Sequence, residues 1–200
     1  MNVIIDYDVG NLESVRKAFL QVGLETVISK DIEVLKQATS LILPGVGAFN
    51  ESMEALKKSG LIPTIKEHVQ KGKYLFGICL GMQLLYDKSF EYGEYEGLGL
   101  LKGTIDYLEV DLKVPHMGWN TLNINQKHPL LKYIKEGDYV YFVHSYYVNT
   151  LDKNIIASAS YGVNVPAIVA QDNIIATQFH PEKSGDVGLN ILRAYKELIE

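Results

Sequence analysis

Residues 73–86 read KYLFGICLGMQLLY, and they contain the only cysteine of the 200-residue chain. Residues 73–78 have the apolar character of a buried strand, and the apolar spacing from residue 80 to residue 89 predicts a helix. Cys79 therefore lies on the turn between the two, with Gly77 and Gly81 beside it. A strand followed directly by a helix is the unit from which parallel α/β sheets are built.

The same alternation recurs through the first half of the chain. Strands are predicted at 2–6, 24–28, 40–44 and 73–78, and helices at 11–23, 31–38, 80–89 and, with a break near Pro63, 50–71. The second half reads as strands with short connections, at 103–110, 120–125, 138–148, 154–161, 165–171 and 173–179, before a helix at 184–199. We therefore predict one α/β domain over residues 1–200. It has a central, mostly parallel sheet flanked by helices, with an additional antiparallel sheet.

Composition excludes several classes of function. The net charge of −5 argues against nucleic acid as the main partner, because a phosphate-binding surface shows as a basic excess. A single cysteine forms no intrachain disulfide, which indicates a reducing compartment. The first residues, MNVIIDYDVGN, do not read as a signal peptide, and no apolar run is long enough to span a bilayer. We expect a cytoplasmic protein that binds neither membrane nor nucleic acid.

The pattern Gly77-x-Cys79-x-Gly81 has the spacing of a nucleophile elbow, which holds a reactive side chain at the carboxyl end of a sheet. Such a turn is sharp, so its neighbours must be small. The following helix start favours the thiolate, and the N–H of Leu80 faces the place where an oxyanion develops. A free cysteine also serves as a small buried apolar residue, so core packing is the alternative.

A thiol nucleophile needs a base, and the base needs an orienting group. In QFHPE, His180 directly follows an apolar strand and Glu182 lies two positions further, which can place both side chains on one side of an extended segment. The alternative is a loop histidine beside a surface glutamate. We interpret His68 as a solvated helix residue and His128 as a structural loop residue.

A second glycine-bearing turn, PGVGAF at 44–49, directly follows the third predicted strand. Its glycines allow backbone angles that point N–H groups at a ligand, although an ordinary tight turn also explains them. This turn and the Cys79 turn should both open at the carboxyl edge of the sheet, where open α/β sheets bind ligands.

Together these motifs resemble the class I, or triad, glutamine amidotransferases. PGVG at 44–47, GICLGMQLL at 77–85 and FHPE at 179–182 carry the resemblance, which covers essentially the whole chain. It implies hydrolysis of L-glutamine through a thioester, with no cofactor and no metal. It assigns three groups of residues: a catalytic triad of Cys79, His180 and Glu182; an oxyanion hole of Val46, Gly47 and Leu80; and a glutamine site of Gly47, Gln83, His144, Ser145 and Tyr146.

Further stretches are similar to the imidazole glycerol phosphate synthase branch of this family: DYDVGNLESV at 6–15, VPHMGWN at 114–120, FVHSYY at 142–147 and Lys183. In that branch the partner is a cyclase subunit, a (β/α)8 barrel, which receives the ammonia within a heterodimer. The resemblance implies an interface that includes Asn11, Ser14, Met117, Trp119, Asn120 and Lys183. Trp119, the sole tryptophan, sits beside a glycine in a loop-like context; a core aromatic is the alternative.

Three other readings compete with this one. A different amidotransferase or a free-standing glutaminase is disfavoured by PHMGWN, which distinguishes this branch from the glutaminases of anthranilate, pyridoxal phosphate and purine synthesis. A peptidase or chaperone-like relative on the same fold would place its nucleophile differently and would not need Gln83. A non-catalytic scaffold with a structural cysteine is disfavoured by the complete set of Cys79, His180 and Glu182.

Overall fold

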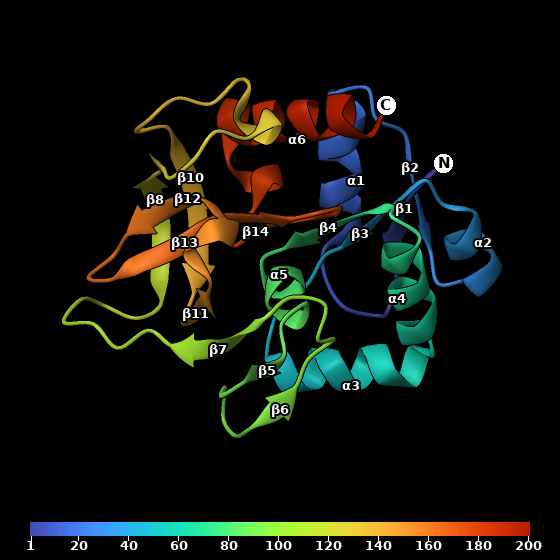
Figure 1. Cartoon of the computed structure of the whole chain (residues 1–200), viewed down its shortest axis with the longest axis horizontal. Coiled ribbons are helices and arrows are strands. Elements are labelled where there is room, and N and C mark those ends of the chain that lie inside the picture. The colour runs from blue at the N-terminus through green and yellow to red at the C-terminus, as the bar shows by residue number, and fades with distance from the viewer.

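The computed structural model describes residues 1–200. An eight-stranded sheet crosses the molecule (Figure 1). Its strand order is β2-β1-β3-β4-β14-β13-β12-β9. These strands are β1 (Asn2–Ile5), β2 (Thr26–Ser29), β3 (Ser40–Leu43), β4 (Tyr74–Ile78), β9 (Asn123–Ile124), β12 (Ile155–Ser160), β13 (Asn164–Gln171) and β14 (Ile174–Thr177). Neighbours from β2 to β14 pair in parallel, and the remaining pairs are antiparallel. The predicted mostly parallel sheet is therefore present.

Helices cover both faces of this sheet (Figure 1). On one face lie α1 (Leu12–Gln21) and α6 (Gly185–Ile199); on the other lie α2 (Ile32–Gln37), α3 (Phe49–Ser59), α4 (Ile62–Gln70) and α5 (Leu80–Leu84). Successive residues of a strand point to opposite faces. Ile42 of β3 accordingly packs with α1 and α6, whereas Leu41 and Leu43 pack with the helices of the other face. The two layers of core explain why these strands are apolar throughout.

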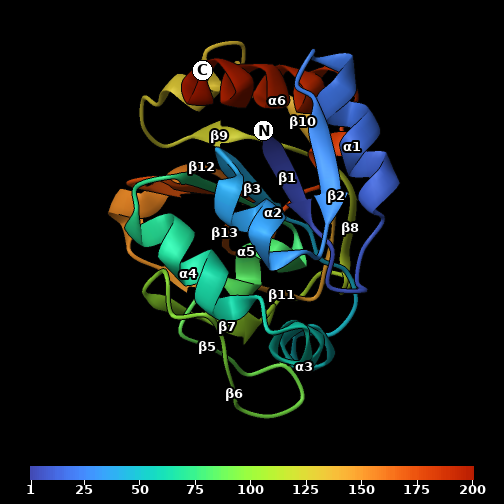
Figure 2. The same cartoon turned by 90° about the vertical axis from the view of Figure 1, so that its right-hand side faces the viewer.

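Two smaller sheets stand beside the main one. The first pairs β8 (His116–Thr121) with β10 (Tyr139–His144), and the second has the order β11-β7-β5-β6, with β5 (Lys88–Ser89), β6 (Tyr95–Glu96), β7 (Gly103–Tyr107) and β11 (Tyr146–Thr150). Short 3-10 helices complete the chain: η1 (Pro129–Leu131), η2 (Asp152–Asn154) and η3 (Pro181–Lys183). The two chain ends lie close together at the end of the sheet where β1 starts (Figure 2).

Four sequence predictions need correction. The helix expected over 80–89 ends at Leu84, because Lys88 and Ser89 form β5 and pair with β7. The strand expected over 138–148 is interrupted at Ser145 and contributes to two sheets. Trp119 lies in β8 and not in a loop. His68 is buried and not solvated, with its Nε2 3.0 Å from the carbonyl oxygen of Tyr74. None of the helices combines the length and apolar character that crossing a bilayer requires.

Candidate active site

The Cys79 turn has the strained backbone of an elbow. β4 ends at Ile78 and α5 begins at Leu80, so that Cys79 alone makes the turn. Its φ of 55° and ψ of −114° lie in a region that residues with a side chain rarely occupy. The backbone N–H of Cys79 donates to the carbonyl of Thr177 on β14 at 2.7 Å, which ties the turn to the neighbouring strand.

The two glycines beside Cys79 are required by close packing. A Cβ on Gly81 would lie 1.9 Å from the carbonyl oxygen of Leu43, and one on Gly77 would lie 3.0 Å from the backbone of Met82. Only residues without a side chain let α5 pack this closely over β3 and β4. The prediction that the turn requires small neighbours is confirmed.

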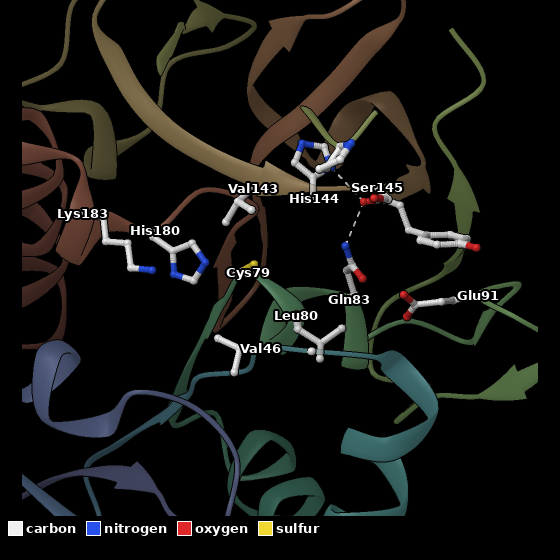
Figure 3. Close-up of a pocket in the computed structure, with 13 residues that line it drawn as sticks. Val46, Cys79, Leu80, Gln83, Glu91, Val143, His144, Ser145, His180 and Lys183 are labelled. Carbon is white, nitrogen blue, oxygen red and sulfur yellow. Dashed lines mark hydrogen bonds between the residues drawn. The ribbon is translucent and has the colours of Figure 1, made fainter. Parts of the chain in front are cut away.

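His180 and Glu182 follow β14, the strand that pairs with β4. Nδ1 of His180 lies 2.7 Å from Oε1 of Glu182, and both side chains are almost fully buried. Donation from Nδ1–H to the carboxylate leaves Nε2 free, and the ring points toward Cys79 (Figure 3). The second oxygen of Glu182, Oε2, is buried without a hydrogen-bond partner.

The electrostatic environment of His180 favours its protonated form. Burial by itself lowers the pKa of His180, but hydrogen bonding and charge from Cys79 and Glu182 outweigh burial and raise the pKa to about 10. An imidazole with this environment can hold the proton that a nearby thiol gives up.

The PGVG turn packs against the start of α5. A Cβ on Gly45 would lie 2.8 Å from the backbone nitrogen of Gly81. The hydroxyl of buried Tyr7 donates to the carbonyl of Pro44 at 2.6 Å, and the hydroxyl of Ser52 lies 3.4 Å from the carbonyl oxygen of Val46. Two hydroxyls from other elements thus brace the turn on either side of Gly45.

A cavity of about 360 Å³ brings together most of the residues selected from the sequence. Its lining contains Val46, Gly47, Cys79, Leu80, Gln83, Glu91, Pro115, Val143, His144, Ser145, Tyr146, His180 and Lys183 (Figure 3). The expected interface residues lie elsewhere, except Lys183. Glu182 stands behind His180 and lines a separate, small cavity of about 20 Å³ together with Asn11 and Lys183.

Glu91 is a lining residue that sequence reasoning missed. Its Oε2 accepts a hydrogen bond from the backbone N–H of Phe49 at 2.6 Å, at the start of α3. Burial raises the pKa of this carboxyl group. Glu91 lies in FEYGEYEG among other acidic residues and belongs to no motif, so that no local signal marked it. Pro115 and Val143, two further lining residues, lie within the quoted stretches 114–120 and 142–147, but neither residue was singled out from the sequence.

A series of hydrogen-bonded polar side chains lies behind the part of the cavity wall that residues 144–146 form. Nε2 of Gln83 and Nδ1 of His144 both lie within 3.0 Å of the carbonyl oxygen of Tyr146 (dashed lines in Figure 3). Behind His144 stands His116, whose Nδ1 is 2.9 Å from Nε2 of His144. Burial lowers the pKa of His144 to about 3 and that of His116 to about 4, so both rings stay neutral near pH 7.

No group of three or more His, Cys, Asp or Glu side chains is arranged to hold a metal ion.

A mostly parallel sheet with a strained cysteine turn, and a buried His–Glu pair after the neighbouring strand, defines an enzyme class with a cysteine nucleophile. The family model described as glutamine amidotransferase class-I matches residues 3–194. The chain belongs to this family.

Individual relatives narrow the comparison. The chain is 52% identical over 198 residues to the imidazole glycerol phosphate synthase subunit HisH of Caldanaerobacter subterraneus subsp. tengcongensis, with 98% of each chain covered. It is 50% identical over 200 residues to the HisH subunit of Oceanobacillus iheyensis, with 100% of each covered. These relatives confirm the branch of the family that the sequence motifs predicted.

Solved structures agree on the fold. A crystal structure of a glutamine amidotransferase superposes with a TM-score of 0.76 at 21% identity, covering 98% of this chain and 97% of that one. A chain from the structure of PurLQS from Thermotoga maritima gives a TM-score of 0.77 at 19% identity, covering 100% and 98%.

Proposed function

We propose that this chain is the glutaminase subunit of an imidazole glycerol phosphate synthase in the cytoplasm. It hydrolyses L-glutamine to glutamate and ammonia and passes the ammonia to a cyclase subunit. The observation that carries the proposal is Cys79 on its strained turn, with the ring of His180 pointing at it inside a cavity of about 360 Å³. The 52% identity to HisH subunits over nearly the whole chain supports this choice of amidotransferase.

The reaction takes two steps at Cys79. His180 accepts the thiol proton, and the sulfur attacks the side-chain amide carbon of glutamine. His180 then gives that proton to the nitrogen of the amide, and the C–N bond breaks. Ammonia departs, and a glutamyl thioester remains on Cys79. Water attacks the thioester with His180 as base, and the C–S bond breaks to release glutamate and restore the thiol. Glu182 holds His180 in the tautomer and orientation that both steps need.

The negative oxygen of each tetrahedral intermediate needs N–H donors. Leu80 begins α5, and its backbone N–H is the first proposed donor. The second comes from the PGVG turn, at Val46 or Gly47, which lines the same cavity. One such donor contributes about 2.7–4 kcal/mol to catalysis, so a rotation of this turn is enough to switch the enzyme on or off.

The far wall of the cavity provides groups for the amino-acid end of glutamine. The carboxylate of Glu91 suits the α-ammonium group, because an opposite charge in a partly buried site gives both affinity and orientation. Both N–H bonds of the Gln83 amide are used within the protein, so its Oε1 is the atom left for substrate. The backbone at Ser145 and Tyr146 completes this wall.

The proposed partner is a cyclase subunit with a (β/α)8 barrel, which uses the ammonia to make imidazole glycerol phosphate and aminoimidazole carboxamide ribonucleotide. Met117 and Trp119 are 58% and 56% exposed and, two residues apart on β8, lie on the same face of that strand. Asn11 and Lys183 line the small cavity beside His180 and Glu182. Exposed large apolar residues next to an active site are typical of a docking surface. The proposed interface also includes Ser14 and Asn120.

The test is glutamine hydrolysis by the chain alone, with the cyclase subunit, and with the cyclase subunit and its nucleotide ligand. We expect low activity alone and a large rise with partner and ligand, since the partner sets the PGVG turn. Trp119→Ala should weaken this activation, whereas Leu20→Ala, an exposed apolar residue on α1, serves as a surface control. Full activity without the partner would refute the gating, and no activity in any mixture would refute the function.

A further inference from the structure

Gln178 touches the nucleophile, and the mechanism above gives it no role. Its side chain is fully buried, and its Nε2 lies 3.9 Å from Sγ of Cys79, within reach of a sulfur acceptor. Its Oε1 lies 3.0 Å from Nε2 of Gln83. The side-chain amide of Gln178 therefore bridges the sulfur and the side chain of Gln83.

The orientation of the Gln178 amide follows from the acceptor on the far side of Gln83, the carbonyl oxygen of Tyr146. The carbonyl of Tyr146 can only accept hydrogen bonds, so the group of Gln83 that faces it at 3.0 Å must be the NH₂. The second hydrogen of that NH₂ then faces Gln178, which must present its oxygen. A reversed Gln178 would set two NH₂ groups against each other. Hence an N–H group of Gln178, and not its carbonyl oxygen, faces Cys79.

Neutral histidines hold the Tyr146 carbonyl in place from behind. Nδ1–H of His144 donates to it at 2.9 Å, which leaves Nε2 of His144 to accept from His116 at 2.9 Å. Nε2 of His116 in turn accepts from the amide of Asn120 at 3.1 Å. Every hydrogen bond in the series has one permitted direction, so the series is self-consistent from β8 to the sulfur.

We propose that Gln178 is a further catalytic residue: its amide N–H donates to the thiolate of Cys79 and holds the sulfur in position for attack, while Gln83 and Tyr146 fix its direction. This inference rests on the proposed function. A donor at the sulfur stabilises the thiolate relative to the thiol and limits rotation of the side chain. It acts before any substrate binds, so its effect is measurable without glutamine.

The test is the rate of alkylation of Cys79 by iodoacetamide in the full chain, followed by intact mass from pH 6 to pH 10. Gln178→Glu keeps the oxygen that faces Gln83 and replaces the N–H with a negative oxygen. We expect alkylation at pH 7.5 to slow about tenfold or more and its midpoint to move to higher pH. Gln171→Glu is the matched control, because Oε1 of Gln171 likewise accepts from an amide, that of Asn154, away from the sulfur. Equal alkylation rates in the two variants would overturn the proposal.

Two measurements cover the case in which Gln178→Glu fails to fold. Gln178→Met keeps the length without a donor and should slow alkylation several-fold. In the wild-type chain, the side-chain ¹⁵N–¹H signals of Gln178 should shift with the same pH midpoint as alkylation. Signals that stay unchanged while Cys79 titrates would overturn the proposal. Neither measurement uses glutamine. A failed glutaminase assay would therefore refute the proposed function without deciding whether Gln178 donates to Cys79.

Discussion

Two residues of the proposed catalytic triad, Cys79 and Glu182, carry features that lower the stability of the fold. Cys79 holds a positive φ, a conformation that costs a residue with a side chain roughly 1–3 kcal/mol. Glu182 keeps one carboxylate oxygen buried without a partner, which carries a desolvation cost. Both features persist because surrounding elements fix them: β14 ties the Cys79 turn by a backbone hydrogen bond, and His180 takes the other oxygen of Glu182.

Glu91→Gln tests the proposed recognition of the α-ammonium group. The amide keeps an oxygen that can accept from Phe49, so the start of α3 should stay intact, but the negative charge is lost. Because hydrogen bonds to charged groups contribute about 1.5–3 kcal/mol, we expect KM for glutamine to rise roughly 10- to 100-fold with a smaller change in kcat. Steady-state kinetics of the complex measures this. A fall in kcat with an unchanged KM would remove Glu91 from the binding site.

At the scale of elements, local sequence patterns predicted most of the helices and strands. The β4–turn–α5 unit was readable because apolar runs, glycines and the cysteine follow one another within residues 73–86. The end of α5 was not, because Lys88 and Ser89 leave the helix to pair with β7, whose position the local spacing does not reveal. Trp119 was misplaced similarly: β8 exists through its pairing with β10, where Trp119 lies opposite Tyr141.

Gly81→Ala tests whether close packing of α5 on β3 holds the elbow. The added Cβ would lie 1.9 Å from the carbonyl oxygen of Leu43. Because the clash is between backbone segments, β3 or α5 would have to shift to relieve it. Gly60→Ala is the control, since its Cβ meets nothing within 4 Å and only its φ of 72° is unfavourable, at about 1–2 kcal/mol. We expect Gly81→Ala to lower the free energy of unfolding in urea by about 1–3 kcal/mol more than the control. Equal losses would contradict this packing argument.

At the scale of the molecule, the order of strands in the main sheet brings the proposed catalytic residues together. β14 comes late in the chain yet pairs with β4, which brings His180 beside Cys79 across 101 residues. The sequence motifs indicated both residues, and the shared carboxyl edge of the sheet explains why they meet. Glu91 and Gln178 were not selected, because what distinguishes them is hydrogen bonds between distant segments. The contact of Gln178 with Gln83 spans 95 residues and has no local signature.

Buried neutral histidines should make the whole fold sensitive to acid. Burial lowers the pKa of His68 to about 4, as it lowers the pKa values of His116 and His144. The unfolded chain takes up these protons near pH 6.5 and the folded chain does not, so stability falls as pH drops from about 6.5 to about 4. His180 behaves oppositely: its raised pKa stabilises the fold below about pH 6.5, and this contribution is lost as pH rises to about 10.

His68→Gln isolates one of these groups away from the active site. Glutamine can still donate to the carbonyl of Tyr74 and does not titrate. Each proton bound only by the unfolded chain contributes a slope of about 1.4 kcal/mol per pH unit. Urea unfolding between pH 4.5 and pH 7 should therefore show a shallower loss of stability in His68→Gln than in the wild type. An unchanged slope would mean that His68 is protonated equally in both states.

The most direct measurement of the central claim compares two nitrogen sources in the complex with the cyclase subunit. Cys79→Ala removes only the sulfur, so the fold and the ammonia acceptor site should remain. We predict that formation of imidazole glycerol phosphate from glutamine is abolished, while formation from added ammonium salt stays within about twofold of the wild-type complex. Retained use of glutamine, or loss of both activities in a folded complex, would contradict a separate glutaminase site at Cys79.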